Sequence, residues 1–188
     1  MISFQLSDEQ RMIRDMARDF AQNEILPLAE EYDQSHEYPW PVVRKAQEVE
    51  IMNLNIPEAY GGPELGILEE CIVNEELAHA CSGIQTALML NSLASLPLLL
   101  AGSEEQKQRY LSRMAEDGEL AAFALTEPDA GSDVAGIKSR AVRQGDVYVL
   151  NGSKTWITNS PVANFYVVFA KTDPEGRHKG ISLSLIHI

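Results

Sequence analysis

The sequence has 188 residues, 45% of them apolar, and its 28 acidic and 15 basic side chains give a formal charge of -13. Enough apolar residues are present for a real core, which argues against a disordered chain. The negative charge repels phosphate backbones and argues against nucleic-acid binding. Two cysteines, Cys71 and Cys81, are too few for a disulfide framework or a CxxC metal site.

The first residues, MISFQLSDEQ, resemble neither a signal peptide nor an Arg-rich transit peptide. The longest apolar segment, residues 92–101, is too short to span a bilayer and contains Pro97. These features and the low cysteine content predict a soluble, cytoplasmic protein.

Helical periodicity dominates the first part of the chain. Ser7 and Gln10 form a capping box that starts a helix, and Pro27 is expected to bend or end it. Pro39 and Pro41 open a second helix.

A Gly- and Pro-rich loop, NIPEAYGGPELG, follows, and helices are predicted over residues 67–81 and 83–101. Ser103 and Gln106 form a second capping box, for a last helix that ends near residue 115. We expect an all-α domain over residues 1–119.

After residue 120 the apolar period changes to two. The stretch KSRAVRQGDVYVLNGSKTWITNS alternates and is punctuated by QGD and by NG, the latter being the strongest short hairpin signal. NFYVVFAKTD is rich in aromatic and β-branched residues. An antiparallel β domain is therefore predicted over residues 120–188, and the fold class is α+β with two domains.

The last stretch, KGISLSLIHI, begins like another strand and then stops, which leaves about four strands and an uncovered apolar edge. We interpret the sequence as truncated, with a tail, SLIHI, that need not be native. A complete small α+β protein with a protected last strand is the alternative.

The polar segment FALTEPDAGSDVAGIK, residues 123–138, carries acids that could be calcium ligands. With Glu127 at position 1 of an EF-hand, Gly131 falls at position 5 and Lys138 at position 12, where ligands are required. The spacing therefore does not fit an EF-hand.

The same segment comes closer to a phosphate-binding loop. GSDVAGIKS departs from GxxxxGK[ST] by Ile137, which separates the Gly from Lys138, and Asp133 would repel a triphosphate. Gly131 and Ser132 could still bind one phosphate or a pyrophosphate through backbone amides. An ordinary Gly-Ser turn is the alternative.

A second stretch, NGSKTWITN, carries an aromatic residue and hydroxyls. As a strand it would place Trp156 and Thr158 on one face, with Thr155, Ile157 and Asn159 on the other. Trp156 would then cover the ring of a planar heteroaromatic ligand, and Thr158 would bond its edge. A core Trp beside a surface Thr is the alternative.

LTEPDAGSD followed by WIT resembles the flavin signature of the acyl-CoA dehydrogenase family. IPEAYGG, NEELAHACSGIQTALMLNSL and NGSKTWITN extend the resemblance over nearly the whole chain, to the medium-chain members in particular. The resemblance implies a helical N-terminal domain, a β middle domain and a C-terminal four-helix domain. The sequence covers the first domain and part of the second, and the four-helix domain is absent.

The resemblance also implies FAD as cofactor. Thr126 would lie near flavin N5, Gly131 and Ser132 near the phosphates, and Trp156 near the ring edge where an electron-transfer flavoprotein docks. Ser132 would also contact acyl-CoA. The expected flavin contacts on the two stretches are Phe123, Leu125, Thr126, Gly131, Ser132, Trp156, Ile157 and Thr158.

The implied reaction is the α,β-desaturation of acyl-CoA to trans-2-enoyl-CoA in fatty-acid metabolism, by a homotetrameric oxidoreductase. The catalytic Glu is expected in the missing C-terminal region, so no catalytic residue is assigned and the chain is expected to be inactive. Gln85 would lie at the acyl pocket. Met89 and Leu90 stand where medium-chain members carry Glu and Gly, which leaves the acyl length open, and core packing explains both residues equally.

The sequence also offers alternatives to an acyl-CoA dehydrogenase. Glu76 and His79 form an ExxH pair, but a di-iron bundle needs a second one and the sequence contains none. An acyl-CoA oxidase that uses dioxygen and a non-catalytic helical interaction module are the alternatives to the dehydrogenase.

Overall fold

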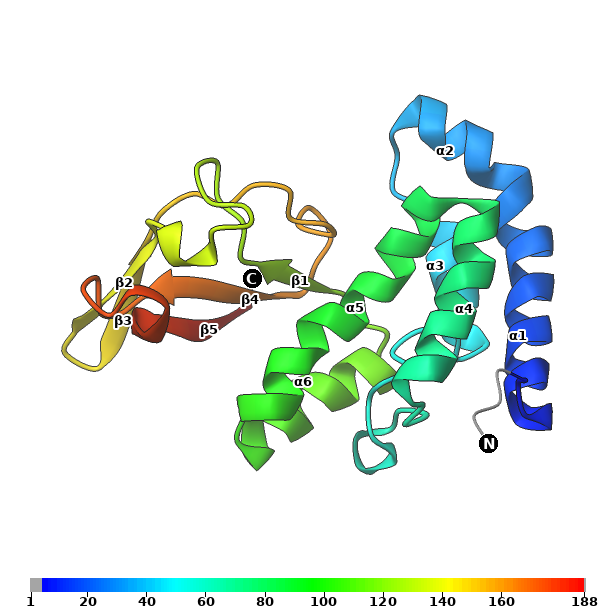
Figure 1. Ribbon diagram of the computed structural model, residues 1–188, viewed down its shortest axis with the longest axis horizontal. Helices are drawn as coiled ribbons and strands as arrows, with labels where there is room; N and C mark the ends of the chain where they lie inside the picture. The colour runs from blue at the N-terminus through cyan, green and yellow to red at the C-terminus, as the bar shows by residue number, and fades with distance from the viewer. Residues whose placement is uncertain (1–4, 188) are drawn as a thin grey trace. The chain divides into compact units, whose positions relative to one another are not determined.

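The computed structural model describes residues 5–187, and the chain divides into two compact units, Met1–Gly118 and Glu119–Ile188. The first unit is helical and the second is built on a sheet (Figure 1). This arrangement confirms the predicted α+β fold class. We call the two parts the helical unit and the β unit.

Both predicted capping boxes are present in the helical unit. The Ser7 hydroxyl accepts from the Gln10 amide at the start of the first helix, and Ser103 does the same for Gln106 at the start of the last. In the described part of the unit the α-helices are α1 (Asp8–Phe20), α2 (Ala29–Ser35), α3 (Trp40–Glu48), α4 (Ile67–Ala80), α5 (Ser82–Ala101) and α6 (Glu104–Glu116).

The chain changes helical form between α1 and α2. A π-helical turn, Ala21–Ile25, leads into a 3-10 turn, Leu26–Leu28, where Pro27 cannot donate a backbone hydrogen bond. Pro27 thus lies in the break between α1 and α2, in agreement with the expectation that it bends or ends the helix. Sequence reasoning missed α2, because AEEYDQS is polar on nearly every side and has no apolar period.

The core of the helical unit lies where α4 packs against α1 and α5 (Figure 1). Leu77 of α4 and Leu88 of α5 are fully buried there. By length and composition α5 could cross a membrane, and 44% of its apolar window is buried in the structure.

The segment just before the IPEAYGG motif is held by hydrogen bonds of asparagine side chains. Asn53 donates to the Met114 carbonyl at 2.8 Å and accepts from Asn91 at 3.0 Å, and all three lie in the helical unit. A Cβ on Gly62 would lie 2.2 Å from the Ile56 carbonyl oxygen. This motif therefore shapes the scaffold, because its backbone approaches too closely for any side chain.

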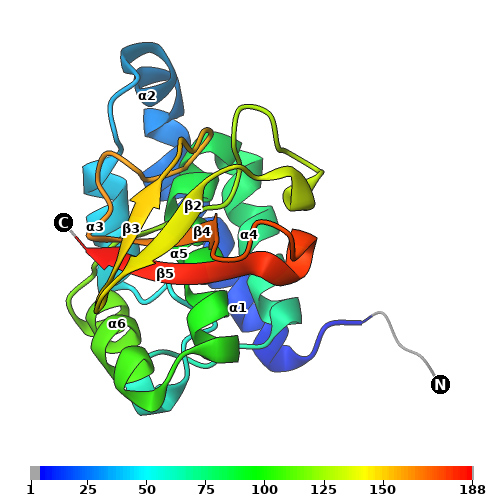
Figure 2. The same ribbon diagram turned by 90° about the vertical axis from the view of Figure 1, so that its left-hand side faces the viewer.

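The β unit contains one sheet, whose strands within the described residues are β1 (Ala121–Ala124), β2 (Arg140–Gln144), β3 (Val147–Asn151), β4 (Phe165–Lys171) and β5 (Ile181–His187). β4 pairs in antiparallel fashion with β5, and β2 and β3 form a hairpin (Figure 2). β1 runs parallel to β4, and β2 meets β4 in parallel at one residue pair, Arg140 with Lys171. The sheet is therefore mixed and not purely antiparallel. The tail residues up to His187 belong to β5, and Ile188 lies outside the described residues.

Of the two turn signals, QGD makes the hairpin and NG, the stronger signal by residue type, does not. The β2–β3 connection is Gly145–Asp146, while Asn151 ends β3. Gly152 is needed for a different reason: a Cβ there would lie 2.0 Å from the Ser139 hydroxyl. A close approach of two segments, which local sequence does not reveal, accounts for this glycine.

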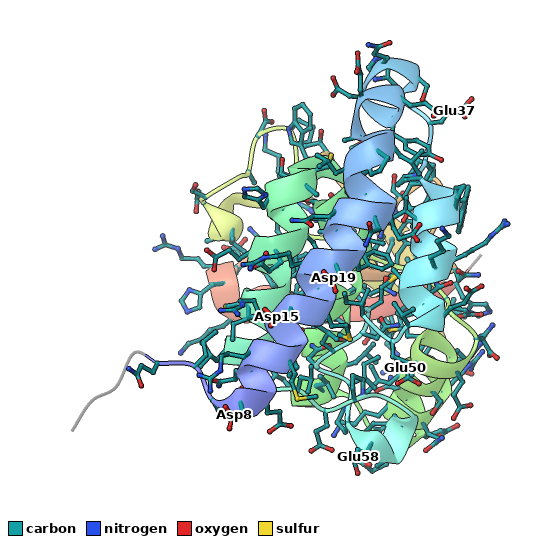
Figure 3. All side chains as sticks on the ribbon, turned by 90° about the vertical axis from the view of Figure 1, so that its right-hand side faces the viewer. Asp8, Asp15, Asp19, Glu37, Glu50 and Glu58 are labelled. Atoms are coloured by element: carbon teal, nitrogen blue, oxygen red, sulfur yellow. The ribbon has the colours of Figure 1, made fainter. Side chains whose placement is uncertain are left out.

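The two units differ in charge. Residues 1–118 hold 21 acidic and 8 basic side chains, whereas residues 119–188 hold seven of each, so the helical unit carries the whole net charge. Its exposed acids include those labelled in Figure 3, Asp8, Asp15, Asp19, Glu37, Glu50 and Glu58.

Candidate functional site

The segment that carries Trp156 is a series of turns. Residues 152–164 contain no strand, and Trp156 and Asn159 have left-handed backbones with φ of 59° and 63°. The predicted strand alternation through residues 151–159 is therefore wrong, since each left-handed residue redirects the side chains. Trp156 is 90% exposed, which also excludes the alternative of a core Trp.

Beside Trp156 the β unit has an open hollow of about 550 Å³. Its floor is one face of the sheet, where Ala124 lies opposite Val168, and Tyr166 opposite Ile186. Residues from the turn segment form its wall. The lining is Ala124, Lys154, Thr155, Trp156, Ile157, Ser160, Tyr166, Val168 and Ile186.

The two stretches that carry the resemblance lie side by side. The Thr155 amide donates to the Thr126 carbonyl at 3.0 Å, and the Lys154 ammonium donates to the Leu125 carbonyl at 2.9 Å. LTEP and KTWIT are thereby joined at the edge of the hollow.

A buried ion pair strengthens this junction. The Glu127 carboxylate, 5% exposed, accepts from Lys154 Nζ at 2.8 Å and from the amides of Lys138 and Ser139 at 2.5 and 3.0 Å. Lys154 is itself 12% exposed. We call these four residues the Glu127 clamp. Sequence reasoning missed Lys154, although a lysine in a ligand-binding motif was a usable signal.

The clamp fixes the charge state of its carboxyl group. Burial alone would raise the pKa of Glu127, but the hydrogen bonds from Lys138, Lys154 and Ser139 outweigh it and lower the pKa to about 2. Glu127 therefore stays ionised and bonded at neutral pH.

The remaining acids of the loop are exposed. Glu127 and Ala130 exchange two backbone hydrogen bonds of 3.1 Å around Pro128 and Asp129, which makes a tight turn. The Asp129 carboxylate pairs with Lys138 at 2.7 Å and raises the pKa of that lysine. These contacts agree with a structural role for the acids of this loop.

The predicted phosphate-binding residues are accessible. Gly131 and Ser132 are exposed, and a Cβ on Gly131 would meet no atom within 4 Å. Within residues 5–187 the amides of Gly131 and Ser132 donate to no protein acceptor. They are free to bind an anion.

Other predicted contacts lie away from the hollow. Phe123 packs against Phe169 with ring centroids 4.9 Å apart, on the sheet face opposite Ala124. Thr126 and Thr158 are half-buried and do not line the hollow.

In the helical unit, the predicted acyl-pocket residue has a partner within the protein. The Gln85 amide donates to the Asn74 side chain, which joins α5 to α4. Met89 is buried, in agreement with the core-packing interpretation of that position.

The metal interpretation gains no support. No group of three or more His, Cys, Asp or Glu side chains in the described residues is placed to hold a metal ion. Glu76 of the ExxH pair accepts two hydrogen bonds from Arg18, at 2.6 and 2.9 Å.

Comparisons with known proteins agree with the two-unit arrangement. Residues 7–118 match the family described as acyl-CoA dehydrogenase, N-terminal domain, and residues 122–187 match acyl-CoA dehydrogenase, middle domain.

Curated relatives include a probable medium-chain specific acyl-CoA dehydrogenase of Caenorhabditis briggsae, 41% identical over 92% of this chain and 42% of its own. Another is a cyclohex-1-ene-1-carbonyl-CoA dehydrogenase of Geobacter metallireducens, 44% identical over 96% of this chain and 48% of its own. The chain thus spans about half the length of the curated relatives it matches.

Solved structures also resemble the chain over nearly its whole length. Butyryl-CoA dehydrogenase from Megasphaera elsdenii is 33% identical with a TM-score of 0.91, over 99% of this chain and 50% of its own. A chain from a study of the electron transferring flavoprotein of Acidaminococcus fermentans is 40% identical with a TM-score of 0.93, over 100% of this chain and 50% of its own. On the matches to its two domain families and on these likenesses, the chain belongs to the acyl-CoA dehydrogenase family.

Proposed function

We propose that this chain is part of an FAD-dependent acyl-CoA dehydrogenase, which converts an acyl-CoA thioester to the trans-2-enoyl-CoA. The observation that carries the proposal is the junction of LTEP with KTWIT beside a hollow that exposes Trp156. The names of the relatives support the acyl-CoA substrate class.

The residues present fit FAD. An isoalloxazine is planar with apolar faces, and the hollow offers an exposed indole and an apolar floor that includes Ala124 and Val168. Its volume is within the range of about 300–1,000 Å³ typical of ligand pockets. The unpaired amides of Gly131 and Ser132 suit a pyrophosphate.

Each predicted contact receives a role in this proposal. Trp156 and Ile157 would pack on the ring, and Ser132 would serve phosphate and acyl-CoA. Thr126 and Thr158 lie just outside the lining, next to Thr155 and Ile157, and would donate to the ring edge from there. Leu125 contributes its backbone. Phe123 acts through packing on Phe169, because it lies on the other sheet face. When bound, FAD supplies the acceptor for the hydride that leaves the substrate β-carbon.

Two acids of the LTEPDAGSD loop, Glu127 and Asp129, are unsuited to abstract the α-proton. A general base works best when its pKa lies near the operating pH, whereas the pKa of Glu127 is about 2. Asp129 is held by Lys138. We propose that the base is a carboxylate from the part of the relatives that this chain does not span. The 188-residue chain alone would then be inactive.

Four further properties of the full-length protein are proposed from the sequence and its family resemblance. They are a homotetramer, an electron-transfer flavoprotein as acceptor, a cytoplasmic location and Gln85 at the acyl pocket. Oxygen uptake by a full-length protein would favour the oxidase alternative, whereas reduction of an artificial acceptor without oxygen uptake would favour the dehydrogenase.

FAD binding by the purified chain tests the proposal directly. We expect the flavin fluorescence to change on titration with the wild-type chain, and Trp156→Ala to weaken FAD binding by about 1–3 kcal/mol through loss of ring stacking. Trp40→Ala, which removes the Trp of the helical unit, is the control and should bind FAD as the wild type does. A wild-type chain without FAD affinity, or equal affinity of Trp156→Ala, contradicts the proposal.

A further inference from the structure

We propose that Lys154 is a positioning residue, which fixes the loop carrying Trp156 against the strand end carrying Thr126. The inference rests on the proposed function for its purpose and on the Glu127 clamp for its mechanism. Lys154 itself lines the hollow next to Trp156.

Few contacts hold the loop to the strand end. Between residues 125–127 and 154–155 the structure shows one backbone hydrogen bond, from Thr155 to Thr126. The other two hydrogen bonds both come from the Lys154 ammonium, to the Leu125 carbonyl and to Glu127. Lys154 thus supplies two of the three connections.

Trp156 has little packing of its own to hold it. Its side chain is 90% exposed and its backbone is left-handed, a conformation that a non-glycine residue keeps only when its surroundings enforce it. The neighbouring residues must therefore set its direction, and Lys154, two positions before Trp156, makes buried polar contacts to the strand end.

A lysine suits this position because one ammonium group donates both to the neutral Leu125 carbonyl and to the negative Glu127 carboxylate. An apolar side chain would leave the Leu125 carbonyl without this donor and the buried Glu127 carboxylate without its counter-ion. Arginine also carries several donors and a permanent charge, so Lys154→Arg is the conservative replacement.

Hydrogen exchange of the Thr155 amide measures the loop contact without any ligand. In Lys154→Met we expect this amide to exchange faster by about tenfold or more, because the loop opens locally. The amides of the β4–β5 ladder should keep their wild-type rates, and Lys154→Arg should restore protection at Thr155.

Lys138→Met is a matched control. It removes another lysine–carboxylate pair from the same region, but Lys138 and Asp129 are 73% and 70% exposed, and the Lys138 amide still bonds Glu127. We expect wild-type exchange at Thr155. The double variant Lys154→Met with Glu127→Gln leaves no unpaired buried charge, so it remains informative if the single variant fails to fold, and Thr155 should still exchange fast.

The results separate the two proposals. Equal acceleration at Thr155 and in the β4–β5 ladder would make Lys154 a general stability residue, and unchanged exchange at Thr155 would show that the loop does not depend on it; either overturns the positioning role. FAD titration of the same variants forms the second arm, where about tenfold weaker binding by Lys154→Met, with rescue by Lys154→Arg, is expected. Absence of FAD binding by the wild type would overturn the proposed function, while the exchange data still decide how the loop is held.

Discussion

The helical unit and the β unit bury different kinds of groups. The helical unit keeps its excess acids on the surface, and its buried polar side chains are neutral, such as Asn53, Asn91 and Ser95. The β unit is neutral overall but buries the charged pair of Glu127 and Lys154, and most of its buried apolar residues are alanines. Large apolar contacts thus dominate the core of the helical unit, whereas the β unit adds charge-assisted hydrogen bonds to a smaller apolar core that contains Phe165.

The strongest way to break this comparison is to remove the buried carboxylate. Glu127→Ala leaves Lys154 as a buried cation without its counter-ion, and we expect the β unit to lose about 3–5 kcal/mol. Hydrogen exchange followed separately in the two units should show the loss in the β unit alone. Asp129→Asn, which breaks the exposed pair, should cost less than about 1 kcal/mol and is the control. Similar costs for the two substitutions would contradict the contrast.

In the helical unit, the corresponding test is a substitution that creates a cavity in the apolar core. Leu88 is fully buried in α5, so Leu88→Ala should cost about 3 kcal/mol through lost transfer energy and the space left behind. Denaturant unfolding with helix content as readout measures it. The exposed Leu100→Ala provides the comparison and should change stability by less than about 0.5 kcal/mol.

Low pH should destabilise the β unit, because it protonates Glu127 of the Glu127 clamp. The folded-state pKa of Glu127, about 2, lies below its ordinary value of 4.5, so its contribution to stability is complete above pH 4.5 and is lost as the pH falls towards 2. The shift corresponds to about 3 kcal/mol. Comparing β-unit stability at pH 5 and pH 2.5 in the wild type and in Glu127→Gln tests this, since the variant should lack that part of the acid dependence. An identical pH dependence in both proteins would show that other carboxylates dominate.

The smallest effect is expected at a helix start. Ser103→Ala removes the hydroxyl that accepts from the Gln106 amide and should destabilise the helical unit by about 1 kcal/mol. Thermal unfolding measures it, and Ser103→Asp should retain most of the stability because Asp is an equally good cap. If Ala and Asp behave alike, the cap contributes little to this helix.

The accuracy of the sequence predictions depended on whether the signal was local. The capping boxes and the helices over residues 67–81 and 83–101 were found because each is encoded within a few residues. The parallel pairing of β1 with β4 joins residues more than forty positions apart, and no local period encodes it. The strand predicted through Trp156 failed because the backbone there is left-handed, which the alternation of residue types did not reveal.

For the candidate site, residue types and their order in the motifs LTEPDAGSD and WIT were enough to pair the two stretches and to indicate the family. Only the tertiary structure showed that Lys154 and Glu127, 27 positions apart, form a buried pair that ties these stretches at the hollow. The reason is physical: a residue type shows what a side chain can bond, whereas its partner and burial depend on how distant segments of the chain come together.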